Sequence, residues 1–171
     1  MGGTALPSRL HRRRSRRAEG GFSLVELLIV IALIGILGGI AAYSWQRYVD
    51  NTNLKTAARE LVQDINNTRS RAVTETATYR IVVSTGDNNY RIEKEATAGS
   101  YTAVTTRSLN EFGAGSGLAV EAVNFSGGNT ISFFTRGTIS PGTLTLKNGR
   151  GSRAVITVNM TGKSHVQFSM Q

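Results

Sequence analysis

The sequence contains no cysteine, so it can form neither a disulfide nor a thiolate metal site. No proline lies between Pro7 and Pro141, so no proline interrupts a helix over this stretch. Of the two histidines, His11 stands in an arginine-rich leader, and His165 has no serine or aspartate at the spacing of a catalytic motif. The acids form no dense oxygen cluster of the sort a hard cation needs. We therefore expect no enzyme, no metal and no cofactor.

Acidic residues are missing from the last fifty positions, although five basic residues occur there. These basic residues are Arg136, Lys147, Arg150, Arg153 and Lys163. Clustered cations could bind the phosphate backbone of double-stranded DNA in a salt-sensitive way. They could equally form a solvated face or contact an acidic neighbour subunit. No aromatic platform interleaves with them, so stacking on single strands is not expected.

Charge is also nearly absent from residues 22–43, an apolar run that contains only Glu26. Twenty-two residues form a helix of roughly 33 Å, enough to span a hydrocarbon core of about 30 Å. The run lacks the small-residue cleavage site that ends a secretory signal. Six arginines precede it against one acid, Glu19, so the positive-inside rule predicts a cytoplasmic N-terminus and residues 44–171 outside.

Glu26 is costly in such a segment and should have a partner, since an acid at the centre of a membrane helix costs roughly 2.5–3.5 kcal/mol. A cut between Gly21 and Phe22 would create an α-amine four residues before Glu26. That amine is largely an ammonium near neutral pH. It could pair with Glu26 of its own chain or of a neighbour, and the second pairing would set the stagger of an assembly. The alternative is a plain signal anchor in which Glu26 is incidental.

Beyond the run, the pattern predicts that the helix continues to about residue 75. Apolar residues recur there at spacings of three, four or seven, as expected for one covered face: Leu54, Ala58, Leu61, Ile65 and Ala72. From residue 77 the pattern becomes that of short strands separated by Gly, Asn and Pro turns. The predicted strands cover 77–84, 89–96, 101–109, 130–137, 142–149, 153–159 and 164–169. Residues 110–120 are predicted to be a glycine-rich connection.

The stretch "GFSLVELLIVIALIGIL" resembles the N-terminus of a type IV prepilin or pseudopilin. The resemblance implies that a prepilin peptidase cuts after Gly21, that Phe22 becomes N-methylated, and that Glu26 aligns subunits during assembly. Unlike many pilins, the chain has no proline midway along this helix and no C-terminal disulfide. Downstream, residues 131–166 resemble the C-terminal part of GspH/FimT-type minor pseudopilins, with Phe133 to Gly137 at the position of a Phe-x-x-x-Gly turn.

Some FimT-type proteins are DNA receptors in natural transformation and carry a Gly-Arg-x-Arg motif near the C-terminus. The matching piece here reads Gly162, Lys163, Ser164, His165, and it departs from the motif at both basic positions. The resemblance therefore leaves DNA binding as an alternative function.

We predict an α+β fold in which a long N-terminal helix packs on a small antiparallel β-sandwich-like domain. The expected segments are a cleaved leader (1–21), a transmembrane or filament-core helix (22–43), its amphipathic continuation (44–76) and a β-rich globular part (77–171). The expected function is that of a minor pseudopilin or minor pilin in a type II secretion pseudopilus or a type IV pilus. Its expected partners are other pilins or pseudopilins, the prepilin peptidase and the inner membrane, with double-stranded DNA in the alternative.

Overall fold

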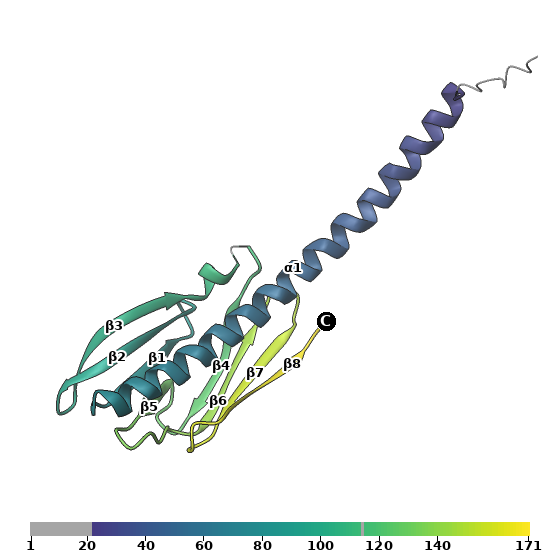
Figure 1. Cartoon of the computed structure of the whole chain (residues 1–171). Coiled ribbons are helices and arrows are strands. Elements are labelled where there is room, and N and C mark those ends of the chain that lie inside the picture. Colours follow the sequence, from purple (N-terminus) through teal and green to yellow (C-terminus); the bar gives the residue numbers. More distant parts are fainter. Residues whose placement is uncertain (1–21, 114) are drawn as a thin grey trace, which may run out of the picture. The chain divides into compact units, whose positions relative to one another are not determined.

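The computed structural model describes residues 22–113 and 115–171, so every prediction about the leader, including Gly21, lies outside the described residues (Figure 1). The chain divides into two units, residues 1–40 and 41–171. The second unit holds every strand that the structure describes and is called the head below. The predicted boundaries at residues 43 and 76 mark functional segments and stay predictions.

One helix, α1, runs over Leu24–Thr74, 51 residues, and confirms the long N-terminal helix. It begins where the carbonyl of Ser23 accepts a hydrogen bond from the amide of Leu27. It ends where Thr76 adopts a positive φ of 47° and the amide of Ala77 turns back to the carbonyl of Ala72. The absence of proline permits this length, which packing must then stabilise, because long helices gain most of their stability from a covered face.

In the described part of the chain, eight strands form two antiparallel four-stranded sheets, which confirms the predicted fold class. The first sheet has the order β3-β2-β1-β5 and the second the order β4-β6-β7-β8. The strands of the first sheet are β1 (Tyr79–Ser84), β2 (Asn89–Thr97), β3 (Ser100–Ser108) and β5 (Thr130–Phe133). Those of the second are β4 (Ala119–Phe125), β6 (Gly142–Lys147), β7 (Arg153–Val158) and β8 (Ser164–Ser169).

The core of the head lies between α1 and one face of each sheet. Burial alternates along β1 and β7, as it does in strands with one covered face. The predicted helical stripe from Leu54 to Ala72 is buried and belongs to the same hydrophobic cluster as both sheets. Within the head, α1 therefore runs alongside both sheets (Figure 1).

The strand predictions differ from the structure in two places. Residues 119–125 form β4, whereas the sequence pattern assigned their beginning to a glycine-rich connection. The predicted strand over 130–137 ends at Phe133, because the amide of Gly137 bonds to the carbonyl of Phe134 and closes a turn. A short 3-10 helix, η1 (Leu109–Phe112), also precedes the glycine-rich loop.

Candidate functional site

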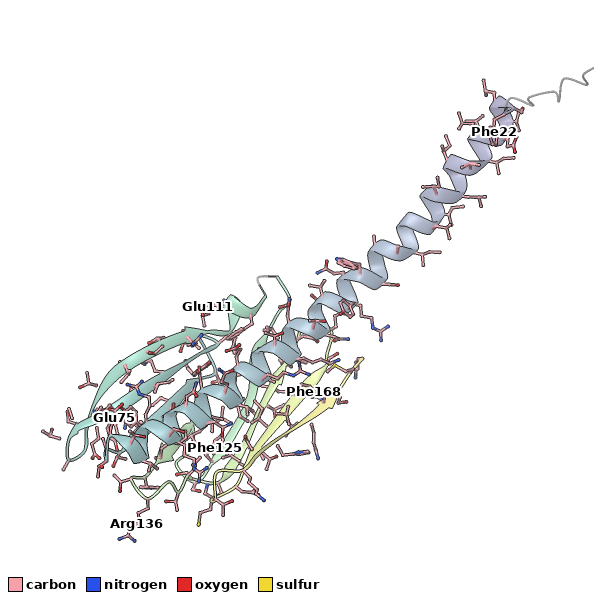
Figure 2. The ribbon with its side chains drawn as sticks, viewed as in Figure 1. Phe22, Glu75, Glu111, Phe125, Arg136 and Phe168 are labelled. Atoms are coloured by element: carbon pink, nitrogen blue, oxygen red, sulfur yellow. The ribbon has the colours of Figure 1, made fainter. Side chains whose placement is uncertain are left out.

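The first candidate site is the apolar run, which the rest of the described chain leaves uncovered. Its large hydrophobic side chains are between 44% and 84% exposed, with Phe22 the most exposed. Among the described residues, α1 is the one helix long and apolar enough to cross a membrane. Exposed apolar surface on this scale marks a site for lipid or for other protein, and Figure 2 shows these side chains around the ribbon near Phe22.

Glu26 lies in the first turn of α1 and its side chain is exposed. The Ser23 carbonyl opens the helix, so Ser23 is the N-cap residue and Glu26 stands three positions later. A serine followed at this spacing by a glutamate is the pattern of a capping box, and a carboxylate is favoured at the positive end of a helix. No side-chain hydrogen bond joins the described residues Ser23 and Glu26, so the favourable contribution that remains for Glu26 is its place at the positive end of the helix.

Three glycines interrupt the apolar surface of α1. A side chain added at Gly35, Gly38 or Gly39 would meet no atom within 4 Å. Gly35 and Gly39 are spaced as a small-xxx-small pair, which lets a second helix approach closely in a membrane. The apolar run therefore carries a flat strip suited to a neighbouring helix.

The second candidate site is the basic end of the sequence, and the structure does not bring its five cations together. Arg150, in the β6–β7 turn, forms an ion pair with the buried Asp50 of α1. Arg153 makes two hydrogen bonds of 2.7 Å to the carboxylate of Glu121 on β4. This contact with Arg153, helped by nearby Lys147, holds the pKa of Glu121 below its usual value. At this end of the sheet, acids from elsewhere in the chain therefore offset the basic side chains.

A hydrogen-bonded network ties the same β6–β7 turn to α1. The side-chain amide of Asn148 donates to Asn51 Oδ1 over 3.0 Å, and the hydroxyl of Ser152 donates to the same oxygen over 2.8 Å. The chain end joins this network, because the amide of Gln171 donates to Ser152 and its carbonyl accepts from Arg47. Asn148 and Ser152 are buried, so these bonds satisfy polar groups that water cannot reach and fix the turn.

The other two cations, Arg136 and Lys163, stand next to two glycines that contact Arg69 of α1, at the opposite end of the sheets. Arg69 Nε donates to the carbonyl of Gly137 over 2.8 Å. A Cβ on Gly162 would lie 2.6 Å from Arg69 Nε. The turn before β6 and the turn before β8 thus both lie against the guanidinium of Arg69. Figure 2 shows the side chain of Arg136 pointing away from the ribbon at this end.

Both glycines in this arrangement belong to positions singled out in the sequence. Gly137 ends the Phe133–Gly137 turn, and Gly162 opens the segment that matches the degraded Gly-Arg-x-Arg motif. Both have a positive φ, 79° and 83°, a conformation that glycine adopts readily. At Gly162 the structure supplies a packing reason as well, because an added Cβ would lie 2.6 Å from Arg69 Nε. At Gly137 the nearest atom to an added Cβ would be a methyl carbon of Val73, 3.3 Å away.

A cluster of charges joins the end of α1 to the first sheet. Glu75 accepts hydrogen bonds from Lys94, Tyr79 and Arg71, with distances of 2.6, 2.5 and 3.1 Å. These contacts, the one with Lys94 foremost, lower the pKa of Glu75 to about 2. Burial, and then the bond to Glu75, raises the pKa of Tyr79. The cluster fixes the change of direction between helix and strand.

No group of three or more His, Cys, Asp or Glu side chains that could hold a metal occurs among residues 22–113 and 115–171. The two candidate sites are therefore best described as contact surfaces: the apolar run is apolar, and the basic end is charged.

Comparison with known proteins identifies the family. The family model for "Type II transport protein GspH" matches residues 57–162, more than half of the chain. The chain belongs to the GspH family. A second model, the prokaryotic N-terminal methylation motif, matches residues 16–42. The two matches confirm the resemblance found in the sequence, and GspH-type and pilin families consist of structural subunits that assemble with other pilin-like subunits.

Among individual proteins, pilins and a type II secretion protein match parts of this chain. A fimbrial protein of Pseudomonas aeruginosa is 44% identical over 45 residues, which are 26% of this chain and 29% of that protein. Type II secretion system protein H of Xanthomonas campestris is 35% identical over 68 residues, 37% of this chain and 40% of that protein. The chain thus aligns with less than half the length of each of these relatives.

Solved structures support the GspH-type fold over most of the chain. The minor pseudopilin EpsH from the type 2 secretion system of Vibrio cholerae superposes with a TM-score of 0.56 at 12% identity, over 68% of this chain and 97% of that one. The type IV minor pilin FimU of Pseudomonas aeruginosa gives a TM-score of 0.53 at 16% identity, over 70% of this chain and 92% of that one. At these identities the likeness concerns the fold.

Proposed function

We propose that this GspH-family protein is made as a precursor, is cut between Gly21 and Phe22 by a prepilin peptidase, and is N-methylated at Phe22. The mature chain is held in the inner membrane by residues 22–43, with its N-terminus cytoplasmic and the head outside. From there it enters a type II secretion pseudopilus or a type IV pilus as a minor subunit. The observation that carries the proposal is the methylation motif joined, on one chain, to an uncovered apolar helix and a GspH-type head.

Glu26 has a specific part in this proposal. In the mature chain it lies four residues from the new Phe22 amine, and in the first turn of α1 its side chain is exposed. An ammonium and a carboxylate can neutralise each other in lipid, where neither is stable alone. Pairing between neighbouring chains aligns their helices, whereas pairing within one chain only lowers the cost of burial.

The test separates processing from assembly. In cells that make the cognate filament, Gly21→Leu should leave the leader attached, as shown by intact mass. Glu26→Ala should be cut and methylated but should be depleted from the sheared filament fraction. Asp87→Ala removes an exposed acid of the head and serves as the control, with normal incorporation expected. Normal cleavage of Gly21→Leu contradicts the peptidase step, and normal incorporation of Glu26→Ala contradicts the alignment role.

DNA binding is the second candidate function, and one observation favours it. A hollow of about 440 Å³ beside Arg136 is lined by Arg69, Val73, Arg136 and Gly137 but by no acid. Among the described residues, Arg136 and Lys163 form no ion pair, in contrast to Arg150 and Arg153. Such a group could contact a phosphate backbone without reading the base sequence.

The corresponding experiment measures binding of the full mature chain in detergent to double-stranded DNA across a salt series. If Arg136 and Lys163 bind DNA, replacing both by alanine should weaken binding. The slope of log affinity against log salt concentration should also fall by roughly two, about one for each cation that no longer neutralises a phosphate. Lys147→Ala, at the other end of the sheet, is the matched control and should change little. The control removes one charge where the double variant removes two, so a weakening about half as large in the control would mean that the effect is one of net charge.

A further inference from the structure

Two aromatic side chains stand exposed directly after the apolar run. Trp45 is 68% exposed and Tyr48 is 65% exposed. The two residues are three positions apart on α1 and therefore share a face. Their ring centroids are 6.2 Å apart in a tilted arrangement. Neither ring belongs to the hydrophobic cluster of the head.

The chemistry of these side chains matches one environment. Tryptophan and tyrosine combine a large apolar body with one polar tip, and they are enriched at the headgroup level of membranes. Among the described residues, no hydrogen bond satisfies the indole N–H of Trp45 or the hydroxyl of Tyr48. A lipid–water interface would cover the rings and still solvate both tips.

The position in the chain points the same way. Trp45 follows Phe22 by 23 residues, which in a helix is a rise of roughly 35 Å, a little more than the hydrocarbon thickness of about 30 Å. Nearby, Arg47 Nε donates to the carbonyl of Gln171, and the adjacent Met170 is 37% exposed. Arg47, whose side chain is exposed, thus places a cation within one helical turn of Trp45.

We propose that in the unassembled subunit Trp45 and Tyr48 insert into the interfacial layer at the C-terminal end of the membrane span and so fix the depth of the helix. The proposal rests on the proposed membrane span of residues 22–43. Its partner is the phospholipid interface, to which the pair adds an anchor that the apolar run alone lacks. A helix of a neighbouring subunit is the rival cover for these rings.

The chain itself provides the probe, because Trp45 is its only tryptophan. The full mature chain is reconstituted in phosphatidylcholine vesicles whose acyl chains carry bromine either close to the headgroup or close to the chain end. Two further single-tryptophan chains calibrate depth: Trp45→Phe with Ile31→Trp for the middle of the span, and Trp45→Phe with Val104→Trp for an exposed site on β3. Acrylamide quenching reports access from water.

We expect Trp45 emission to be lost most strongly with bromine close to the headgroup. The Ile31→Trp chain should respond most to bromine at the chain end, and the Val104→Trp chain only to acrylamide. An Ile31→Trp chain that carries Trp45→Ala and Tyr48→Ala in place of Trp45→Phe should show a weaker preference for bromine at the chain end, because the anchor is gone. If the native chain behaves like the Val104→Trp chain while the Ile31→Trp chain responds normally, the anchor is refuted and the span stands. If the Ile31→Trp chain escapes deep quenching, the span itself fails.

Discussion

At the scale of single residues, the arginine between two turns has the most specific surroundings. Arg69 extends from α1 to a carbonyl on one turn and lies against a glycine of another. A side chain at Gly162 would have to displace the guanidinium and would also take up an unfavourable φ of 83°. Left-handed backbone alone costs roughly 1–2 kcal/mol for a residue other than glycine.

We therefore expect Gly162→Ala to lower the free energy of unfolding by roughly 1–3 kcal/mol, the backbone cost plus the smaller cost of displacing the flexible end of Arg69. Gly99→Ala is the matched control, since Gly99 has a φ of 80° but a Cβ added there would meet no atom within 4 Å. It should show the backbone cost alone. Arg69→Ala should relieve part of the Gly162→Ala penalty, and additive effects in a double-mutant cycle would contradict the contact.

At the scale of elements, the junction between α1 and β1 depends on pH. The pKa of Glu75 is about 2 in the folded chain, against about 4.3 for an unperturbed glutamate. A carboxyl whose pKa is depressed by folding stabilises the native state above its unfolded pKa. That contribution is lost as the pH falls from about 5 towards 2.

The expected result is that the unfolding temperature of the wild type falls steeply over this acid range. Glu75→Gln should be less stable than the wild type at pH 7 and should show a shallower acid dependence. Lys94→Met, which removes the strongest contact of Glu75, should change the profile in the same direction. Thermal unfolding followed by circular dichroism at a series of pH values measures both, and a Glu75→Gln profile parallel to the wild type would count against the assignment.

The elements also show which features of the fold the sequence predicts. The long helix, its buried stripe and most strands can be predicted from the spacing of apolar residues and from the positions of proline. Both are local properties of the sequence. The beginning of β4 was missed because glycines precede it and polar residues interrupt it, so its apolar pattern is weak. The basic end was interpreted as one group because Asp50 and Glu121 lie 100 and 32 positions away from their arginines. Pairing over such separations depends on the folded topology.

At the scale of the whole molecule, the two units differ in what covers their apolar side chains. The head is held by its own core and by the network around Asn51, whereas the apolar run has no cover within the described chain. Changes in the run should therefore affect assembly without affecting the stability of the head. The glycine strip at Gly35 and Gly39 offers a direct test.

We expect Gly39→Leu to be processed, inserted and folded normally but to enter filaments less, by roughly tenfold if close helix contact is worth about 1–2 kcal/mol. Leu37→Ala, also within the run, removes an exposed side chain without filling the strip and is the control. Incorporation is compared by quantifying the subunit in sheared filaments relative to the membrane pool. Equal incorporation of both variants would exclude the strip as a contact.

The hydrogen bonds that join Gln171 to Ser152 and to Arg47 of α1 have a practical consequence for labelling. Gln171 is bound through its amide and its carbonyl, so an epitope tag or fluorescent protein fused there would pull on Ser152 and Arg47. The β2–β3 hairpin tip at Ala98 and Gly99 is exposed, and Gly99 has open space around it. The tip follows Lys94 in the chain, and Lys94 contacts Glu75 just after the C-terminal end of α1. Gln171 contacts Arg47, which lies near the other end of the part of α1 that belongs to the head. An insertion at this tip should mark the subunit in living cells while leaving the hydrogen bonds of Gln171 intact.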